Sequence, residues 1–282
     1  MSRASALRLE TIISRRNTLV ATFRRAAAAR PATVALLDGS RLVEEALSAG
    51  VTVDVAACSE RSLERDEERA LVGELQSRGV RVILATEEVL RAMSPSTTPS
   101  GVVALARVES AGWQALTSRS PALVVVAVSV QDPGNLGALV RVAEGGGADG
   151  VVASGDTADP LGWKALRGAM GSAFRLPVVR ERSIERTVDM LRRLGLRLVA
   201  AIPRGQTMLS ACDLTRPTAV LLGGEGRGLD AAMLGKADET LTIPMRPPVE
   251  SLNVAVAGAL IVFEAARQRG YFPHDPRLTA VP

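Results

Sequence analysis

The sequence predicts an α/β protein of two domains, the second of which carries a mostly parallel sheet. Three observations lead to this prediction. The chain has 282 residues, about twice the usual length of one domain. Segments with strand and helix character alternate along it, as expected where helices connect parallel strands. The strands of the second half are nearly continuous runs of Val, Leu and Ala, which is typical of a sheet covered on both faces.

The composition argues against several other classes of protein. Hydrophobic residues make up 47% of the chain and charged residues 23%, which is close to the globular average and excludes global disorder. Cys58, Cys212 and a single histidine, His274, supply neither a disulfide framework nor an ordinary zinc site, so we expect no metal. The longest apolar run, Val254 to Phe263, has ten residues, about half of what a membrane span needs. With no signal-peptide core either, we expect a cytoplasmic protein.

The first half is predicted to form a small α/β domain over residues 1–106, followed by a linker at 107–120. Its first helix is expected over 14–29, with Ser14 as the N-cap and Pro31 just beyond its end. Strands and helices alternate from there. We expect strands at 32–37, 52–57, 80–85 and 102–106, and helices at 40–49, 64–77 and 87–93.

The second half is predicted to form a domain over residues 121–272, with a tail at 273–282. In open parallel sheets, ligands bind beyond the carboxyl ends of the strands, so the segments that follow strands are the candidate sites. The expected strands are 123–130, 150–153, 176–179, 197–202, 219–222 and 239–243.

Positive charge is concentrated at the start of the chain. The whole sequence has a net charge of +4, but residues 1–30 contain seven arginines and one glutamate. The planar guanidinium group suits phosphate recognition, so these arginines are candidate phosphate contacts. A solvated helix face explains the same pattern, and the charge distribution alone does not separate the two explanations.

Two of the segments that follow strands combine glycines with polar residues. In DPGNLGALVRVAEGGGADG, residues 132–150, a turn leads into a helix that Asn135 opens. Arg141 lies six residues further on, so it shares a face with Asn135 only if the start of the helix is adjusted. An N-cap asparagine and a surface arginine are the simpler explanation. In LLGGEGRGL, residues 221–229, the glycines let a ligand approach the backbone, although tight turns use them equally well.

The third such segment is rich in proline and then becomes helical. It covers residues 242–270, where Pro247 and Pro248 stiffen a loop and Ser251 or Asn253 starts a long helix. The small residues of this helix suit either a helix interface or simple core packing. None of the three segments has GxGxxG or GxxxxGK[ST] spacing, so a dinucleotide site and a P-loop are both poorly supported.

Taken together, the three segments resemble the motifs of the SpoU (TrmH-like) family of S-adenosylmethionine-dependent RNA ribose 2′-O-methyltransferases, within the SPOUT superfamily. The resemblance covers about residues 123–270, in order and at the family's spacing. It implies a catalytic domain with a deep trefoil knot, and a homodimer in which both subunits shape the site. The first half resembles, more weakly, the small ribosomal-protein-like α/β domain with which many members bind RNA.

The resemblance also implies roles for individual residues. Arg141 matches the family's catalytic arginine, and the other matching motif residues are Asn135, Glu225, Ser251 and Asn253. The cofactor, S-adenosylmethionine, is expected to be held largely by backbone groups of Leu222, Gly223, Gly224, Ile243, Met245, Leu252 and Asn253. RNA contacts are expected from Arg15, Arg16, Arg24, Arg25 and Arg30.

The expected substrate is structured RNA, with ribosomal RNA favoured and transfer RNA as the alternative. A non-catalytic RNA-binding or ribosome-assembly protein on the same scaffold is the rival hypothesis. Arginine is normally fully protonated, so Arg141 suits orienting a hydroxyl and a phosphate better than acting as a base. Two positions depart from the family pattern, because many members have asparagine in place of Gly224 and serine in place of Ala169.

Overall fold

A computed structural model describes residues 9–29, 32–96, 100–226 and 228–271. The chain folds into two compact units. The first runs up to Glu109 and also takes in residues 161–174, and the second comprises Ser110–Pro160 and the chain from Arg175 onward. The segment 161–174 lies inside the second domain expected from the sequence, but it packs with the first unit.

The first unit contains a mixed five-stranded sheet with the order β1-β4-β3-β5-β2. β1 and β3 run parallel to β4, whereas β5 runs antiparallel to both β2 and β3. The strands are β1 (Glu10–Ile12), β2 (Val34–Asp38), β3 (Val53–Cys58), β4 (Arg81–Ala85) and β5 (Val102–Arg107). β1 is not predicted from the sequence, because its three residues form a strand only through pairing with β4.

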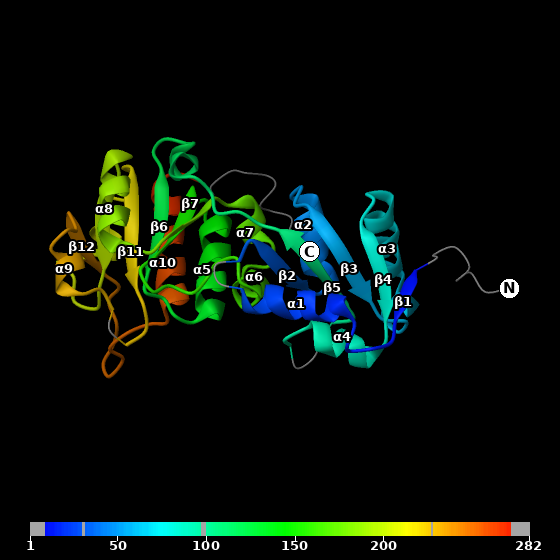
Figure 1. Cartoon of the computed structure of the whole chain (residues 1–282). Coiled ribbons are helices and arrows are strands. Elements are labelled where there is room, and N and C mark those ends of the chain that lie inside the picture. Colours follow the sequence, from blue (N-terminus) through cyan, green and yellow to red (C-terminus); the bar gives the residue numbers. More distant parts are fainter. Residues whose placement is uncertain (1–8, 30–31, 97–99, 227, 272–282) are drawn as a thin grey trace. The chain divides into compact units, whose positions relative to one another are not determined.

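Helices cover both faces of this sheet (Figure 1). α1 and α4 bury Phe23 and Leu90 with Leu36 on one face, whereas α2 and α3 pack with the neighbouring Leu37 on the other. Successive residues of a strand point to opposite faces, so the apolar strands serve two cores. The helices are α1 (Thr18–Ala28), α2 (Ser40–Ser48), α3 (Asp66–Ser77), α4 (Glu87–Met93) and α6 (Trp163–Ala169), with a 3₁₀ turn at Ser62–Glu64.

The start of α1 differs from the prediction. Ser14 is not the N-cap, because the helix begins at Thr18 and the side chain of Asn17 accepts a hydrogen bond from the Leu19 amide at 2.9 Å. The hydroxyl of Ser14 accepts one from the Arg16 amide instead, at 3.2 Å. Pro31, expected to end the helix, lies outside the described residues.

The second unit contains a seven-stranded sheet with the order β10-β12-β9-β11-β6-β7-β8, in which every pair of neighbours is parallel. This confirms the expected parallel sheet. The strands are β6 (Leu123–Val128), β7 (Gly150–Ser154), β8 (Val178–Glu181), β9 (Arg197–Ala201), β10 (Thr207–Met208), β11 (Thr218–Gly223) and β12 (Glu239–Thr242).

Helices pack on both faces of this sheet as well (Figure 1). α8 and α9 share a core with Leu221 of β11, whereas Gly258 of α10 lies against Leu222 and against Leu139 of α5. The helices are α5 (Pro133–Gly145), α8 (Ile184–Arg193), α9 (Ala231–Leu234) and α10 (Val254–Gln268). Two 3₁₀ turns lie at Trp113–Thr117 and Leu209–Ala211. The short helix α7 (Ser172–Arg175) spans the point in the sequence at which the first unit ends and the second resumes.

The start of α5 also differs from the prediction that Asn135 opens this helix. The helix begins at Pro133, and its N-cap is Asp132, whose carboxylate accepts a hydrogen bond from the Asn135 amide at 2.8 Å. Asn135 is therefore the third residue of the helix and does not open it. In the described part of the chain, no helix is both long and apolar enough to cross a membrane. The trefoil knot stays a prediction.

Candidate functional site

A cavity of about 900 Å³ lies at the carboxyl ends of β9, β11 and β12. Three loops contribute to its lining: Ile202–Arg204 after β9, residues 224–226 with Gly228 and Leu229 after β11, and Ile243, Met245 and residues 250–253 between β12 and α10. This is the edge of a parallel sheet at which ligands ordinarily bind. Its size also suits a cofactor or small substrate.

The glycines after β11 allow backbone segments to come unusually close. A Cβ atom on Gly224 would collide with the carbonyl oxygen of Ser129, and one on Gly223 would collide with the backbone of Gly228. The Gly224 amide donates to the Val128 carbonyl at 2.8 Å, so the loop is fixed against the end of β6. An asparagine at position 224, as in many members of the family resembled, has no room in this conformation. The loop thus lines the cavity mainly with main-chain atoms.

Three polar side chains from the three motif segments form one hydrogen-bonded chain. The Asn253 amide donates to the Asn135 side-chain carbonyl at 2.8 Å, and the Asn135 amide donates to the Glu225 carboxylate at 2.5 Å. Asn253 is also the N-cap of α10, where its side-chain carbonyl accepts from the amides of Ala255 and Val256. The start of α10 is therefore tied through α5 to the glycine loop.

Arg141 takes no part in the hydrogen bonds that join Asn135, Glu225 and Asn253. It is exposed on α5, does not line the cavity, and makes no hydrogen bond or ion pair with any described residue. α5 is helical from Pro133 onward, so the adjusted start that would align Arg141 with Asn135 is absent. Six residues along such a helix place the two side chains about 120° apart around its axis.

The remaining candidate residues of the second unit lie around the cavity. All seven expected cofactor contacts line it, as do Glu225 and Ser251. The cavity is also lined by Pro203, Arg204 and Glu250, which were not expected from the sequence. The position of Pro203 and Arg204 follows from the order of the strands, since β9 lies between β11 and β12, and strand order is not readable from the sequence.

The cavity combines an apolar wall with charged groups. Leu222, Leu241 and Ile243 contribute apolar side chains, while Arg204 and the carboxylates of Glu225 and Glu250 also line it. Across residues 9–29, 32–96, 100–226 and 228–271, no group of three His, Cys, Asp or Glu residues is placed to hold a metal ion.

Neither cysteine is placed to act as a nucleophile. Cys58 and Cys212 are both buried. Burial raises the pKa of both thiols, that of Cys58 to about 11, so both are protonated at neutral pH.

An exposed apolar stripe runs along α10 and the residue before its cap. It consists of Leu252, Val256, Leu260 and Phe263, whose exposed fractions range from 37% to 49%. Leu252 belongs both to this α10 stripe and to the lining of the cavity. An exposed apolar stripe of this kind is typical of a surface that another protein covers.

The candidate RNA contacts lie in the first unit. Arg15, Arg16, Arg24 and Arg25 are all exposed. Arg15 pairs with Glu88 at 2.7 Å, and Arg25 donates to the Thr22 hydroxyl at 3.3 Å. Arg30 lies outside the described residues. Ala169, the other departure from the family pattern, is buried in the last turn of α6.

Comparison with known families gives two matches along the chain. Residues 122–263 match the SpoU rRNA Methylase family. Residues 36–109 match the RNA 2′-O ribose methyltransferase substrate binding family. The two matches cover most of both units, and their order along the chain is the one that the resemblance gave to an RNA-binding and a catalytic part.

Similar proteins agree with these matches. The chain is 35% identical to the 23S rRNA (guanosine(2553)-2′-O)-methyltransferase RlmP of Bacillus subtilis over 81% of this chain and 86% of that protein. It is 34% identical to the 23S rRNA (guanosine-2′-O-)-methyltransferase RlmB of Coxiella burnetii, over 73% and 85%. Among solved structures, the SpoU methyltransferase AviRb from Streptomyces viridochromogenes in complex with AdoMet aligns with a TM-score of 0.80, at 29% identity, over 90% of this chain and 98% of that chain.

Proposed function

We propose that this chain, which belongs to the SpoU rRNA methylase family, acts on structured ribosomal RNA. As a member of the family it is an S-adenosylmethionine-dependent enzyme that methylates a ribose 2′-hydroxyl of RNA. The ribosomal substrate is supported by two relatives whose names specify 23S rRNA and that match most of this chain. Transfer RNA is the second candidate substrate, and a cytoplasmic location stays a prediction.

The cavity fits S-adenosylmethionine. The cofactor has an apolar adenine face, which suits the wall of Leu222, Leu241 and Ile243, and a zwitterionic methionine end, which suits the charged groups of Arg204, Glu225 and Glu250. The close approach of Gly223 and Gly224 to neighbouring backbone leaves main-chain groups at the wall. When bound, the cofactor supplies a methyl group already activated by its attachment to a sulfonium.

The residues of the chain then have to align the ribose hydroxyl and dispose of its proton. We assign the orienting role to Arg141, whose guanidinium group has no competing partner among the described residues. Asn135 and Asn253 hold the glycine loop and α10 in register through their amide hydrogen bonds, and Glu225 anchors that chain at its other end. Ser251 lines the cavity two residues before Asn253.

We further propose that the α10 stripe is covered by a second copy of the chain. Leu252 belongs to the stripe and also lines the cavity, so a copy seated on the stripe borders the cofactor site. Such a pairing also explains the position of Arg141, which faces away from the Asn135–Glu225 chain of its own subunit. In a homodimer it is available to the cavity of the partner.

One observation carries the proposal most directly. Three motif segments, separated by 90 and 118 residues in the sequence, are joined by Asn135 at the edge of one cavity. A scaffold that served only to bind RNA would not need this convergence. The polar chain and the cofactor-sized cavity together favour the enzyme over the rival non-catalytic protein.

The test measures methyl transfer from labelled S-adenosylmethionine to 23S rRNA and to transfer RNA, both transcribed without modification. We expect incorporation into 23S rRNA, with a product resistant to alkaline hydrolysis at one linkage, because a 2′-O-methyl group removes the attacking hydroxyl. Calorimetry is expected to show binding of S-adenosylmethionine and not of NAD. Binding of NAD alone would contradict the cofactor assignment, and transfer to transfer RNA alone would contradict the ribosomal substrate.

A further inference from the structure

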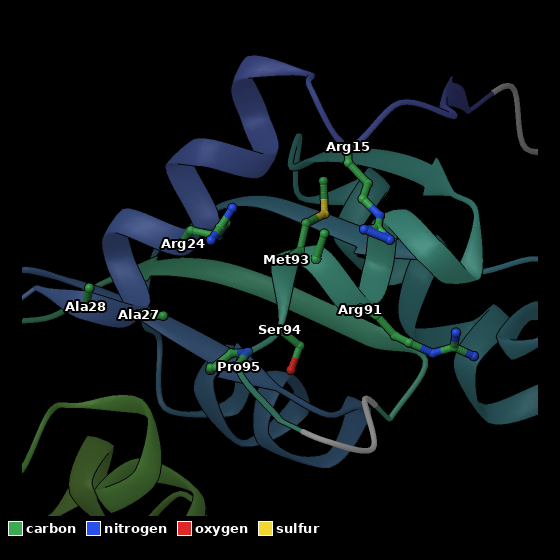
Figure 2. Close-up of a pocket in the computed structure, with 9 residues that line it drawn as sticks. Arg15, Arg24, Ala27, Ala28, Arg91, Met93, Ser94 and Pro95 are labelled. Carbon is green, nitrogen blue, oxygen red and sulfur yellow. The ribbon is translucent and has the colours of Figure 1, made fainter.

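A second cavity lies in the first unit, between α1 and the end of α4. Its volume is about 550 Å³. Figure 2 shows three arginines around it, from three different segments: Arg15 just before α1, Arg24 on α1 and Arg91 on α4. We call this hollow the α1–α4 groove. It is well removed in the sequence from the three motif segments of the second unit.

The charge of the α1–α4 groove is not balanced. Arg24 and Arg91 make no hydrogen bond or ion pair with any described residue, and the described residues that line the groove include no carboxylate. Arg15 pairs with Glu88, but the side chains are 59% and 67% exposed, and exposed pairs contribute little stability. All three guanidinium groups are therefore available to an external anion.

Stabilisation of the helix ends does not explain Arg24. The basic residue in the last turn of α1 is Arg25, and Arg24 precedes it. Arg91 does lie in the last turn of α4, where a cation is favourable in any case. Arg15 lies outside both helices. Interaction with helix dipoles thus accounts for one of the three cations and leaves the gathering of all three unexplained.

The groove is open because its wall is built from small side chains. Ala27 and Ala28 line it from α1, and Met93 from α4 is fully buried beneath it. None of the described residues that line it is aromatic, so these residues offer no platform on which a base could stack. A cationic groove without a stacking surface suits phosphate groups rather than bases.

We propose that the α1–α4 groove binds the sugar–phosphate backbone of the substrate RNA, away from the nucleotide that is methylated. This inference rests on the proposed function, because the RNA is that enzyme's substrate. Of the four expected arginines that the structure describes, it selects Arg15 and Arg24, and it adds Arg91. Contacts of this kind fix the position of the RNA and raise affinity without reading its sequence.

The test compares two double variants with the same change in charge. R24Q/R91Q removes the two unpaired groove cations, whereas R41Q/R61Q removes two exposed arginines of the same unit that neither line the groove nor belong to the expected RNA contacts. The probe is full-length 23S rRNA, transcribed without modification. We expect R24Q/R91Q to weaken RNA binding about tenfold or more, because each substitution removes charged hydrogen bonds between a guanidinium group and an RNA phosphate. For this variant, the slope of the logarithm of the binding constant against the logarithm of the salt concentration should be shallower by about 1.4 to 1.8. This is the change expected for two lost phosphate contacts.

The control variant is expected to stay within about twofold of the parent in affinity, with an unchanged slope. Both variants should bind S-adenosylmethionine normally and reach the parent turnover at saturating RNA, so the change falls on KM. A28E, which places a carboxylate in the groove, should weaken RNA binding with the same sign as R24Q/R91Q.

Three outcomes overturn the inference. Equal losses in the two double variants would show a general effect of charge without a defined groove. Parent-like RNA binding by R24Q/R91Q would remove the groove from RNA recognition. Parent-like RNA binding by R24Q/R91Q together with a loss of inorganic pyrophosphate binding, measured by calorimetry on the parent and on this variant, would show that the groove is a small-anion site. If the parent itself fails to methylate or bind 23S rRNA, the proposed function fails first, which the parent arm reveals independently of the variants.

Discussion

Arg141 is the residue whose position most constrains the mechanism. It is exposed, unpaired among the described residues and outside the cavity. We expect Arg141→Ala to lower methyl transfer by roughly 10² or more, the scale on which a positioned catalytic group acts. The affinity for S-adenosylmethionine should stay the same, because Arg141 does not line the cavity. Arg141→Lys should recover only part of the activity, since lysine lacks the planar fork.

Arg193→Ala provides the matched control for this prediction. Arg193 is an exposed arginine in the last turn of α8 and does not line the cavity either. Its loss changes the net charge equally and should leave turnover unaltered. Near-parent turnover of Arg141→Ala on 23S rRNA would remove Arg141 from the reaction, whatever the family resemblance implies.

At the scale of residues, three of the predicted motif side chains gather as the sequence predicted, whereas Arg141 lies apart from them and their hydrogen bonds were not predicted. Asn135, Glu225 and Asn253 were expected from their motifs, and their hydrogen bonds join all three segments. The cap positions were misread, because Asp132 and Asn135, like Ser14 and Asn17, are alternative caps of similar propensity. The choice between such neighbours depends on where the helix packs, which the local sequence does not contain.

At the scale of elements, the C-terminal end of α10 is held by several side-chain contacts. Arg269, its C-cap, holds the loops before β6 and β11 through main-chain carbonyls. We expect Arg269→Ala to lower the free energy of unfolding of the second unit by about 3 kcal/mol, because it leaves part-buried carbonyl groups without a charged donor. The acceptors are the carbonyl oxygens of Leu214 at 2.8 Å, Pro121 at 2.6 Å, Ala122 at 3.3 Å and Arg216 at 2.9 Å.

Urea unfolding followed by tryptophan fluorescence measures this change. The chain has two tryptophans, and in a Trp163→Phe background the signal comes from Trp113 in the second unit. Arg267→Ala is the control, since its side chain is 69% exposed and forms a surface pair with Glu264 that contributes less than about 1 kcal/mol. Equal destabilisation by the two variants would show that the carbonyl contacts of Arg269 do not hold α10.

The elements that the sequence predicted well are those with a strong apolar pattern. The strands from β6 to β9 and the helix after Asn253 were expected from runs of Val, Leu and Ala, and the structure contains them. β1 and β10 were missed because they are two or three residues long and exist only through pairing with β4 and β12. The packing of residues 161–174 with the first unit was also not predicted, because it too depends on contacts with residues distant in the sequence. Leu161 and Leu166 join a core whose other buried members precede residue 109.

On the scale of the whole molecule, the proposed homodimer would account for the separation of Arg141 from the cavity of its own subunit. We expect the parent protein to scatter light with about twice the mass of its 29.6 kDa chain. L260E/F263E, which charges the α10 stripe, should scatter as a monomer and lose methyl transfer, because charge on a covered apolar face opposes association. M208E alters an exposed methionine elsewhere and should remain a dimer.

Mixing two inactive variants decides whether Arg141 serves its own cavity or that of its partner. Arg141→Ala retains an intact cavity, whereas Gly224→Val retains Arg141 but forces a side chain onto the Ser129 carbonyl and disrupts the glycine loop. If Arg141 acts across the interface, each mixed dimer has one complete site, formed by the cavity of the first variant and the arginine of the second. We expect an equimolar mixture, after subunit exchange, to recover roughly a quarter of the parent activity, because half of the dimers are mixed and each has one working site. No recovery, with mixed dimers shown to be present by differently tagged chains, would place Arg141 in its own subunit's site. The α1–α4 groove and the cofactor cavity are intact in at least one subunit of every mixed dimer, so weak RNA or cofactor binding would not explain that result.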